Sequence, residues 1–419
     1  MLSRVADCLY WMSRYLERAE HTARLLDVQQ YQGLDQRAGP LGAGPVERRW
    51  YRLLAALRAP AVMDGLDPYA ITQSLVFDTA NSASIVSCVE EARDNARQVR
   101  EQISSEMWEQ LNRLYLQVRN TSMDDLWHAE PHEFYKTVRE GAHLFQGITD
   151  ATISHGEGWH FIQLGRYIER AGATVSLLDT YYTAYLEAQR GEETQGMDGD
   201  SDMVPTELGY LDWVGLLKSC TAFEAYSKVY TADVRPDRIA EFLLLDAEFP
   251  RSLRFMAATI QVALQFVARS TGARPAGRAE RLAGRLRATL DYSGIDDIMG
   301  EAMHPYLAEI GQQCATIHAA VYQTYILQQH LDGRRRWVEE VAPRGGDGGE
   351  GGDGSVAVVV PVQTQTQTQT SSSGGYSEDQ LQQQQQVSGA RCQVIGTRGT
   401  RGRDHTSYVT DTYHLSPIT

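Results

Sequence analysis

The sequence predicts an all-α protein in which two homologous helical-bundle halves pack together and a disordered C-terminal tail follows. Three observations lead to this prediction. From Leu2 to about Asp332, apolar residues recur at spacings of three and four, as in amphipathic helices, and few runs alternate as strands do. A long segment occurs twice in this region. After Trp337 the composition becomes that of a chain unable to bury a core.

The repeated segment is the strongest single signal in the chain. Residues 9–28 recur from Phe161 onward, at a shift of 152 positions. Within 14–27, nine of fourteen positions are identical to those of 166–179. Such agreement is hard to obtain by chance, and both copies carry Arg, Tyr, Glu and Arg in the same places. We therefore expect two related helices.

The similarity continues beyond this helix. Each copy is followed by a Gly-rich or polar segment, 33–45 and 190–206, which we expect to loop out between helices. Further matches then occur in the same order in both halves. We predict a first half over 1–150, a second half over 151–341 and a tail over 342–419. The matching pairs are Trp50 with Trp213, Leu53 with Leu216, Leu54 with Leu217, Ile71 with Ile239, Leu75 with Leu243 and Asp78 with Asp246.

The tail has the composition of a disordered extension. Residues 345–354 are only glycine and acidic residues, 363–370 alternate Gln and Thr, and 382–386 are all Gln. Such a segment cannot bury enough apolar surface to offset the entropy of ordering it. We assign the tail no part in the mechanism.

Composition excludes several functional classes. The formal net charge of -15 argues against binding to a phosphate backbone, so we expect no nucleic acid partner. The five cysteines lie far apart without a CxxC pair, as in a reducing cytosol. Charged residues from Arg4 onward interrupt any secretory signal, and no run of about 18 apolar residues occurs. We expect no membrane span and a cytoplasmic location.

The repeated helix has an apolar seam and a separate charged face. Arg14, Glu17 and Arg18 are three and four positions apart, so they share a face turned away from the seam. A solvated face is one interpretation, but an exposed ion pair contributes only about 0.3–0.5 kcal/mol. That contribution does not explain why the same side chains recur in both copies. The seam residues are Val5, Leu9, Met12, Leu16, Ala19, Ala23 and Leu26, then Phe161, Leu164, Ile168, Ala171, Val175 and Leu178.

We hypothesise that the two Glu-Arg helices meet about a pseudo-twofold axis and enclose a polar pocket. Its arginines would bind an anionic or carboxylate ligand, while Glu17 and Glu169 orient the guanidinium groups. A purely structural network between the helices is the alternative, because buried ionic networks can serve packing specificity. The arginines of this predicted site are Arg14, Arg18, Arg166 and Arg170.

Further arginines could contribute to the same pocket. Arg93 and Arg97 lie close together on one predicted helix. Arg251 follows Pro250 near a helix start, where backbone N–H groups could help to hold an anion. Charge compensation by nearby acids is the alternative for all three. Those acids are Asp94, Glu101 and Asp246.

The sequence gives little support for a metal site, a nucleotide site or a serine-hydrolase site. His128 and His132 flank Pro131, which disrupts the helix that would align them, so we expect no metal there. His155 and His160, which lie among glycines, give no better metal site. The chain lacks the GxxxxGK(S/T) and GxSxG motifs, so we expect no nucleotide cofactor and can name no catalytic residue.

Beyond the two Glu-Arg helices, three long segments resemble one bacterial family. They read ARDNARQVREQISSEMWEQLN at 92–112, GITDATISHGEGWHFIQLGRYIERA at 147–171 and EFLLLDAEFPRSLRF at 241–255. The chain resembles the Alpha-E family, a helical domain named for its Glu-Arg motif. The resemblance covers about 1–335 and excludes the tail.

The resemblance implies a partnership. Members of the family look to be encoded beside, or fused to, circularly permuted ATP-grasp ligases and transglutaminase-like proteases. This implies that the chain is the helical component of an ATP-grasp-associated amide or peptide ligase, or of a peptide-modification system. Two alternatives stay open. One is a stand-alone enzyme that uses Glu17 or Glu169 as acid or base, and the other is a non-catalytic scaffold.

Overall fold

The computed structural model describes Met1 and residues 3–36, 44–59, 66–128, 131–195, 209–231, 233–270, 277–327, 395–397 and 410–412. The chain divides into two compact units, Met1–Val341 and Ala342–Thr419. The described residues of the first unit form helices and their connections, which confirms the all-α prediction for this unit.

The elements of the first unit fall into two sets along the chain. The first set is α1 (Ser3–Gln36), α2 (Gly44–Leu57), α3 (Pro68–Val76), α4 (Ile85–Gln98), the 3-10 turn η1 (Arg100–Gln102), α5 (Ser105–Arg119), α6 (Met123–His128) and α7 (Pro131–Thr152). The second set is α8 (Glu157–Gln195), α9 (Tyr210–Ser219), α10 (Phe223–Tyr230), α11 (Pro236–Leu245), α12 (Leu253–Ser270), α13 (Arg278–Tyr292), α14 (Ile295–Ile298), the 3-10 turn η2 (Gly300–Ala302), α15 (Met303–Val321) and the π-helical segment η3 (Tyr322–Leu327).

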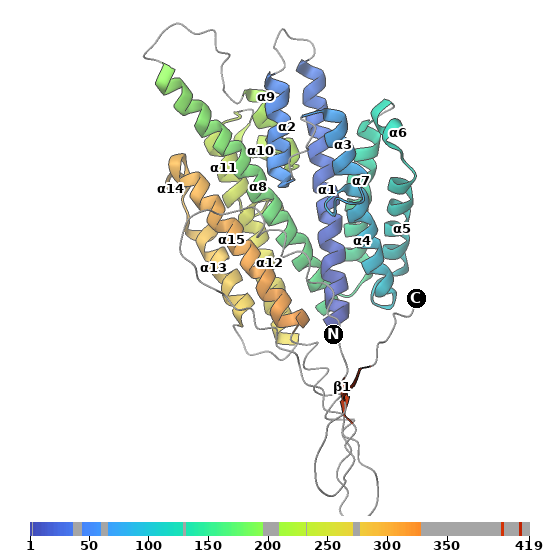
Figure 1. Ribbon diagram of the computed structural model, residues 1–419. Helices are drawn as coiled ribbons and strands as arrows, with labels where there is room; N and C mark the ends of the chain where they lie inside the picture. Colours follow the sequence, from blue (N-terminus) through green and yellow to red (C-terminus); the bar gives the residue numbers. More distant parts are fainter. Residues whose placement is uncertain are drawn as a thin grey trace, which may run out of the picture. The chain divides into compact units, whose positions relative to one another are not determined.

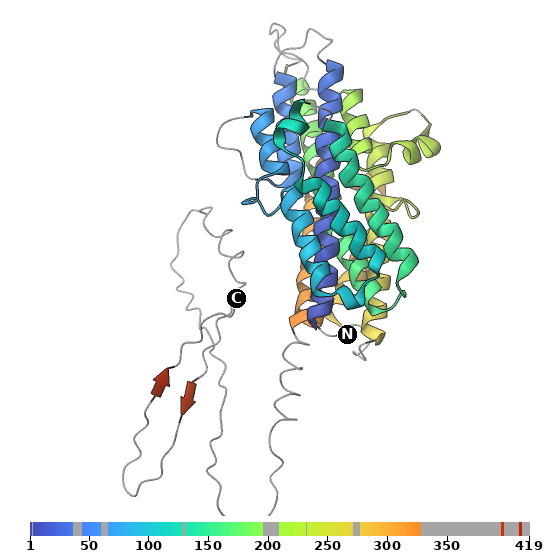
Figure 2. The same ribbon diagram turned by 90° about the vertical axis from the view of Figure 1, so that its right-hand side faces the viewer.

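Two long helices, α1 and α8, lie side by side at the centre of the first unit (Figures 1 and 2). Helices α4 and α7 pack on α1, whereas α12 and α15 pack on α8. Helix α2 contacts both long helices, and so does α9. The arrangement of each set around its own long helix is what a duplication predicts, and the duplication itself stays a prediction.

Helices α1 and α8 run parallel. Their contacts join Met1 to Glu157, Ser13 to the carbonyl of Ile162, and Glu17 to Arg170, at sequence separations of 156, 149 and 153. A nearly constant separation over this length is possible only for helices that run in the same direction. Corresponding positions of the two repeats therefore lie opposite each other.

Small residues permit a close crossing of the two helices. A Cβ atom on Gly165 would lie 2.2 Å from the carbonyl oxygen of Tyr10, so no larger residue fits there without movement. At the equivalent position of the first copy, the Ser13 hydroxyl donates to the carbonyl oxygen of Ile162 at 2.8 Å. The crossing thus places the backbones close enough for short polar side chains to reach across.

The predicted apolar seams are buried in both copies. Of their residues, Val5 is partly exposed and the others are buried. Trp50 and Trp213, which correspond in the repeat, are buried as well. Because α1 and α8 are covered on several sides, their charged faces also lie inside the protein.

Both predicted linkers are partly helical. Helix α1 continues to Gln36 and α2 begins at Gly44, so the predicted loop 33–45 was too long at both ends. Helix α8 continues to Gln195, six residues into the predicted loop 190–206. Glu and Gln favour helix, and a single Gly is tolerated inside one at about 1 kcal/mol. The remaining residues of both linkers lie outside the described residues.

The tail contributes two short strands. In the second unit, β1 (Ile395–Thr397) pairs antiparallel with β2 (Thr410–Thr412), with Gly396 opposite Asp411. The sequence did not predict these strands. The rest of the tail predicted as disordered lies outside the described residues.

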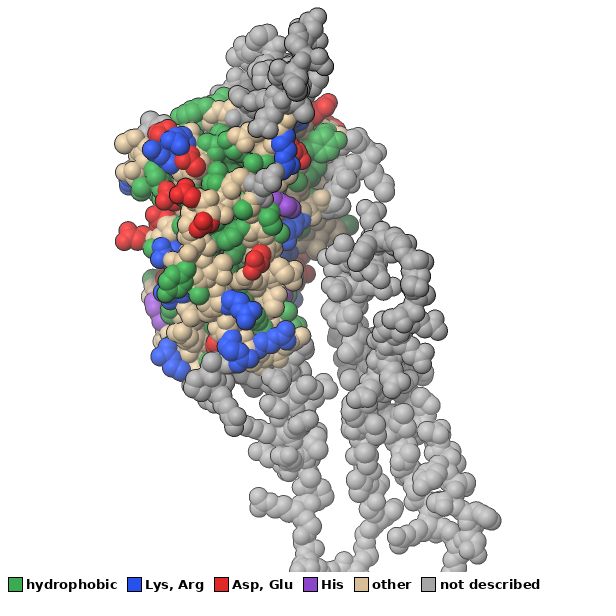
Figure 3. Space-filling view, turned by 90° about the vertical axis from the view of Figure 1, so that its left-hand side faces the viewer, with side chains coloured by type: hydrophobic (Ala, Val, Ile, Leu, Met, Phe, Trp, Pro, Cys, Tyr) green, Lys and Arg blue, Asp and Glu red, His purple; other side chains and the backbone are tan. Residues whose placement is uncertain are grey.

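None of the described helices combines the length and the apolar character that crossing a membrane requires. On the face shown in Figure 3, acidic and basic side chains are interspersed with polar and apolar ones. The second predicted half begins at 151, within the last turn of α7.

Candidate functional site

The charged faces of α1 and α8 meet at their crossing. Glu17 of α1 accepts two hydrogen bonds from Arg170 of α8, at 2.5 Å from Nε and 2.8 Å from Nη2. In return, Glu169 of α8 accepts from Arg14 and Arg18 of α1, each through Nε at 2.7 Å. Each helix supplies the carboxylate for the guanidinium groups of the other.

These carboxylates are buried and ionised. Only 2% of the Glu17 side chain and 12% of the Glu169 side chain are exposed. Burial acts to raise the pKa of Glu17, but Arg170 and Arg251 hold that pKa below its usual value. At Glu169 burial is likewise outweighed, and Arg14 and Arg18 lower the pKa to about 2. Both groups are therefore negative at neutral pH.

The same network continues one turn further along α1. Glu20, whose side chain is fully buried, accepts from Arg24 Nε at 2.8 Å and from Arg251 Nη2 at 2.9 Å. Arg251 Nη1 also lies 3.7 Å from Glu17 Oε1. The predicted residue Arg251 thus joins the crossing, and it binds carboxylates there.

The loop between α11 and α12 holds Arg251 in place. Asp246 Oδ1 accepts from the backbone N–H groups of Glu248 and Phe249, at 2.8 and 2.7 Å. The Ser252 hydroxyl donates to the carbonyl of Asp246 at 2.5 Å and accepts from a backbone N–H in the first turn of α12. These bonds fix the turn that aims Arg251 inward. Asp246 therefore shapes the loop and does not pair with the arginine, as the sequence had allowed.

Helix α15 also contacts Arg14, whose guanidinium binds Glu169 of α8. His318 Nδ1 lies 2.9 Å from Arg14 Nη1 and 2.7 Å from the hydroxyl of Tyr10. Burial lowers the pKa of His318 to about 4, so the ring is neutral at pH 7 and can accept from the guanidinium. The Arg14 guanidinium also lies 4.7 Å from the centre of the Trp11 ring.

Guanidinium groups outnumber carboxylates at the crossing. Five arginines pair with three glutamates, and a sixth arginine, Arg166, lies four residues before Arg170 on α8, so the group carries an excess of positive charge inside the protein. We call the following residues the crossing network: Arg14, Glu17, Arg18, Glu20, Arg24, Arg166, Glu169, Arg170 and Arg251.

Arg166 is the member that breaks the symmetry of the pairing. Its repeat counterpart Arg14 binds Glu169, so strict symmetry would pair Arg166 with Glu17. Instead, among the described residues no carboxylate oxygen lies within 4.0 Å of the Arg166 guanidinium, and only 5% of the residue is exposed. It donates to Gln163 Oε1 at 3.3 Å. Burial, and next Arg170, lower the pKa of Arg166.

The network reaches solvent at one edge. The side chain of Arg18 is 28% exposed, more than any other member whose ion pairs are described above. Proton transfer is poorly served at the crossing, because its glutamates are ionised and already bonded to arginine.

Arg93 and Arg97 are not brought to the crossing network. Arg93 donates to Asn112 at 2.9 Å and stacks 4.5 Å from the centre of the Tyr115 ring. The Arg97 side chain is 61% exposed and lies 3.5 Å from Asp94. Their described contacts are within α4 and with α5, which is the charge-compensation alternative.

The histidines considered for metal binding have other partners. His132 Nδ1 lies 2.8 Å from Asp27 Oδ1, and His304 Nδ1 lies 2.6 Å from Asp179, the repeat counterpart of Asp27. His155 stacks on a neighbouring Trp ring. Within the described ranges, no group of three His, Cys, Asp or Glu side chains is placed to hold a metal ion.

Sequence reasoning missed Glu20, Arg24 and His318. Glu20 and Arg24 are four residues apart on α1, one turn beyond the motif, which was a usable signal. The second copy has Gly172 and Ser176 at these positions, so the repeat does not single out Glu20 and Arg24. His318 had no signal, because its role depends on which helix covers Arg14.

Comparison with known proteins matches the chain to one protein family. A family model for Alpha-E, described as a predicted alpha-helical domain with a conserved ER motif, matches residues 1–326. An uncharacterised protein of Mycobacterium bovis and two of Mycobacterium tuberculosis strains are each 25% identical over 340 residues, covering 76% of this chain and 35% of the relative. The chain therefore spans about a third of the length of these curated relatives. No solved structure matches the chain.

Proposed function

Since the chain belongs to the Alpha-E family, we propose that it is the helical component of an ATP-grasp-associated amide or peptide ligase system. In this proposal the crossing network receives a carboxylate of the substrate or of a partner's acidic segment. A circularly permuted ATP-grasp protein and a transglutaminase-like protease are the partners that the family resemblance implies. The greater length of the curated relatives supports a helical unit that works beside other parts.

The proposed ligand role rests on one observation: buried guanidinium groups outnumber carboxylates in the crossing network. An unpaired buried charge is destabilising by several kcal/mol, because the interior does not replace its hydration (about 3–5 kcal/mol when one partner of a pair is removed). Arg166 is such a group, with no carboxylate among its described contacts. A carboxylate from outside would satisfy it through two parallel N–H···O bonds, the geometry that arginine favours.

The stand-alone enzyme is the weaker alternative. A general acid or base works best when its pKa lies near the working pH. The pKa of Glu169 is lowered to about 2 and that of Glu17 also lies below its usual value. Neither carboxylate is therefore tuned for proton transfer at neutral pH.

A scaffold role is the second candidate. It is favoured by the two-bond pairing of Glu17 with Arg170, which joins α1 to α8 directly. The two candidates differ in what Arg166 does, because a scaffold has no need of a guanidinium without a carboxylate partner.

The proposal is tested by reconstitution. The chain is mixed with the circularly permuted ATP-grasp protein of the same organism, ATP, Mg²⁺ and a panel of amino acids and acidic dipeptides. ADP release and condensed products are followed by mass spectrometry. We expect condensation to require both proteins. Turnover by this chain alone would reject the proposal in favour of the enzyme alternative.

Variants separate the ligand role from the scaffold. Arg166→Gln should raise KM for the carboxylate substrate by about tenfold or more, because a charge-assisted bond is worth about 1.5–3 kcal/mol. Arg285→Gln, an exposed change on α13, is the control with the same loss of charge. Equal KM values for the two variants would leave only the scaffold.

A further inference from the structure

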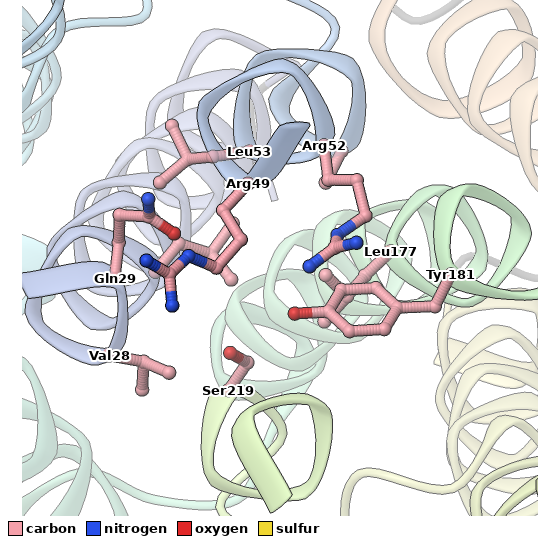
Figure 4. A pocket seen from close by; sticks show the side chains of 10 residues that line it. Val28, Gln29, Arg49, Arg52, Leu53, Leu177, Tyr181 and Ser219 are labelled. Carbon is pink, nitrogen blue, oxygen red and sulfur yellow. The ribbon is translucent and has the colours of Figure 1, made fainter. Parts of the chain in front are cut away.

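A cavity of about 420 Å³, which we call the α11 cavity, is lined by residues of α10 to α14 and of the loops between them. Its volume falls within the range of small-molecule sites, roughly 300–1,000 Å³. By contrast, the cavity between α1, α2, α8 and α9, beside Arg52 and Tyr181, has a volume of about 20 Å³ and room for one water molecule (Figure 4). Of the two, the α11 cavity is large enough for an organic ligand.

Part of the lining is apolar. Phe242 of α11 and Leu290 of α13 are buried in the core, and Leu245 and Ile295 pack against it. The Tyr230 ring meets the Phe242 ring edge to face, with the ring centroids 6.4 Å apart. Such a surface favours the hydrocarbon part of a ligand, because apolar groups gain free energy when they leave water.

The positive charge of the lining is already compensated. Arg254 Nε donates to Asp291 Oδ1 at 2.8 Å, and Arg254 Nη1 donates to the carbonyl of Leu245 at 3.3 Å. Asp291 Oδ2 also accepts from Arg287 Nε at 3.3 Å. The hydrogen bond from Arg254 lowers the pKa of Asp291, so this carboxylate is ionised and paired. Arg254 and Asp291 therefore leave the charge of the other lining residues unbalanced.

Two further carboxylates of the cavity have no cationic partner among the described residues. Glu241 Oε2 accepts from the Tyr230 hydroxyl at 3.0 Å, and Asp246 Oδ1 accepts from two backbone N–H groups of its own loop. Arg238, one turn before Glu241, forms its ion pair with Asp233 at 2.7 Å. Within the described part of the chain, Glu241 Oε1 and Asp246 Oδ2 thus keep their capacity to accept hydrogen bonds.

These two carboxylates lie near the same hydroxyl. Burial, then the hydrogen-bonded Glu241 and also the charge of Asp246 raise the pKa of Tyr230. Tyr230 therefore stays protonated at neutral pH and donates to Glu241. Two like charges beside one cavity repel each other, and a bound cation would relieve that repulsion.

We propose that the α11 cavity binds a small organic amine, with Glu241 and Asp246 accepting from its ammonium group and the apolar lining contacting its hydrocarbon part. An ammonium group has three N–H donors and no acceptor, which suits carboxylate oxygens on two sides. A metal ion fits less well, because no three His, Cys, Asp or Glu side chains of the described residues are grouped to hold one. The α11 cavity shares no residue with the crossing network and does not depend on the proposed ligase role.

Calorimetry of the full chain tests the α11 cavity. Butylamine, leucinamide and the neutral analogue 1-butanol are titrated separately at about pH 6.5, where both amines are protonated, with sodium chloride holding the ionic strength constant. We expect saturable binding of at least one amine, and binding of 1-butanol that is at least about tenfold weaker. Binding of leucinamide alone assigns a peptide N-terminus, and binding of butylamine assigns a free amine. If neither amine binds saturably, or if 1-butanol binds as tightly, the proposal is overturned.

Matched variants locate the binding. Glu241→Gln should weaken it by at least about tenfold, the loss expected for a charge-assisted bond. Glu224→Gln, an exposed change on α10 with the same loss of charge, should leave the affinity unchanged. Equal weakening by the two variants would overturn the proposal, because it would indicate attraction to the net charge of the protein and not to the cavity.

Two more variants keep the test decisive. If Glu241→Gln does not fold by circular dichroism, Asp246→Asn replaces it, because the amide oxygen can still accept from the two backbone N–H groups of the loop. Asp246→Asn should also weaken binding about tenfold, and an unchanged affinity would reject the site. Arg166→Gln should not alter amine binding, so a failure of the ligase proposal and a failure of this one can be told apart.

Discussion

The crossing network and the arginines of α4 look alike as sequence but differ as structure. Both are clusters of arginine with acids nearby. At the crossing, the glutamate side chains are no more than 12% exposed and each bonds to arginine of another element. On α4, Arg97 is 61% exposed and its described ion pair is with its neighbour Asp94. Charged residues form a buried network only where another helix covers their face. We therefore expect mutations to be more destabilising at the covered cluster than at the exposed one.

The largest effect should come from Glu20→Gln. This change leaves Arg24 and Arg251 buried without the carboxylate that they share, so we expect a loss of about 3–5 kcal/mol in the free energy of unfolding. Urea unfolding measures it. The control is Glu90→Gln, whose carboxylate is 37% exposed beside Arg119, and which should change stability by less than about 0.5 kcal/mol. Similar losses of unfolding free energy in the two variants would show that burial does not distinguish the crossing network from an exposed ion pair.

Gly165→Ala should have the next largest effect. Its new methyl group would meet the Tyr10 carbonyl oxygen at 2.2 Å, and overpacking of this kind is destabilising by about 1–3 kcal/mol. Gly172→Ala is the matched control on the same helix, because no atom lies within 4 Å of its Cβ position. The control should gain up to about 1 kcal/mol, as alanine favours helix. Thermal unfolding of both variants decides whether the close crossing exists.

Acid should weaken the crossing through Glu169. Its pKa falls from the usual 4.5 to about 2 in the folded state, so the stabilisation is fully present above pH 4.5 and is lost as the pH drops toward 2. We expect a loss of about 2–3 kcal/mol from this group. Glu169→Gln should flatten this part of the profile of unfolding free energy against pH. A wild-type slope retained in the variant would assign the acid sensitivity to other groups.

The smallest effect should come from Arg97→Ala. An exposed arginine 3.5 Å from Asp94 contributes less than about 0.5 kcal/mol, and substrate KM in the reconstituted assay should not change. A marked rise in KM would restore Arg97 to the ligand site predicted from the sequence.

The sequence predicted the all-α fold and the meeting of the two charged helix faces for physical reasons. The period of three and four identifies buried faces, and a motif kept twice identifies the charges that meet, as with Glu17 and Arg170. It could not show which helix covers a charged face. For that reason it placed Arg93 and Arg97 with the site and overlooked Glu20, whose equivalent in the second copy is a glycine.

A double-mutant cycle on Glu17 and Arg170 tests whether the charged faces of α1 and α8 meet inside the protein. Urea unfolding is measured for the wild type, Glu17→Met, Arg170→Met and the double variant. If these side chains face each other inside the protein, each single change should be strongly destabilising and the double variant should recover much of the loss, with a coupling energy of about 2–3 kcal/mol. Additive losses, with coupling below about 0.5 kcal/mol, would contradict it.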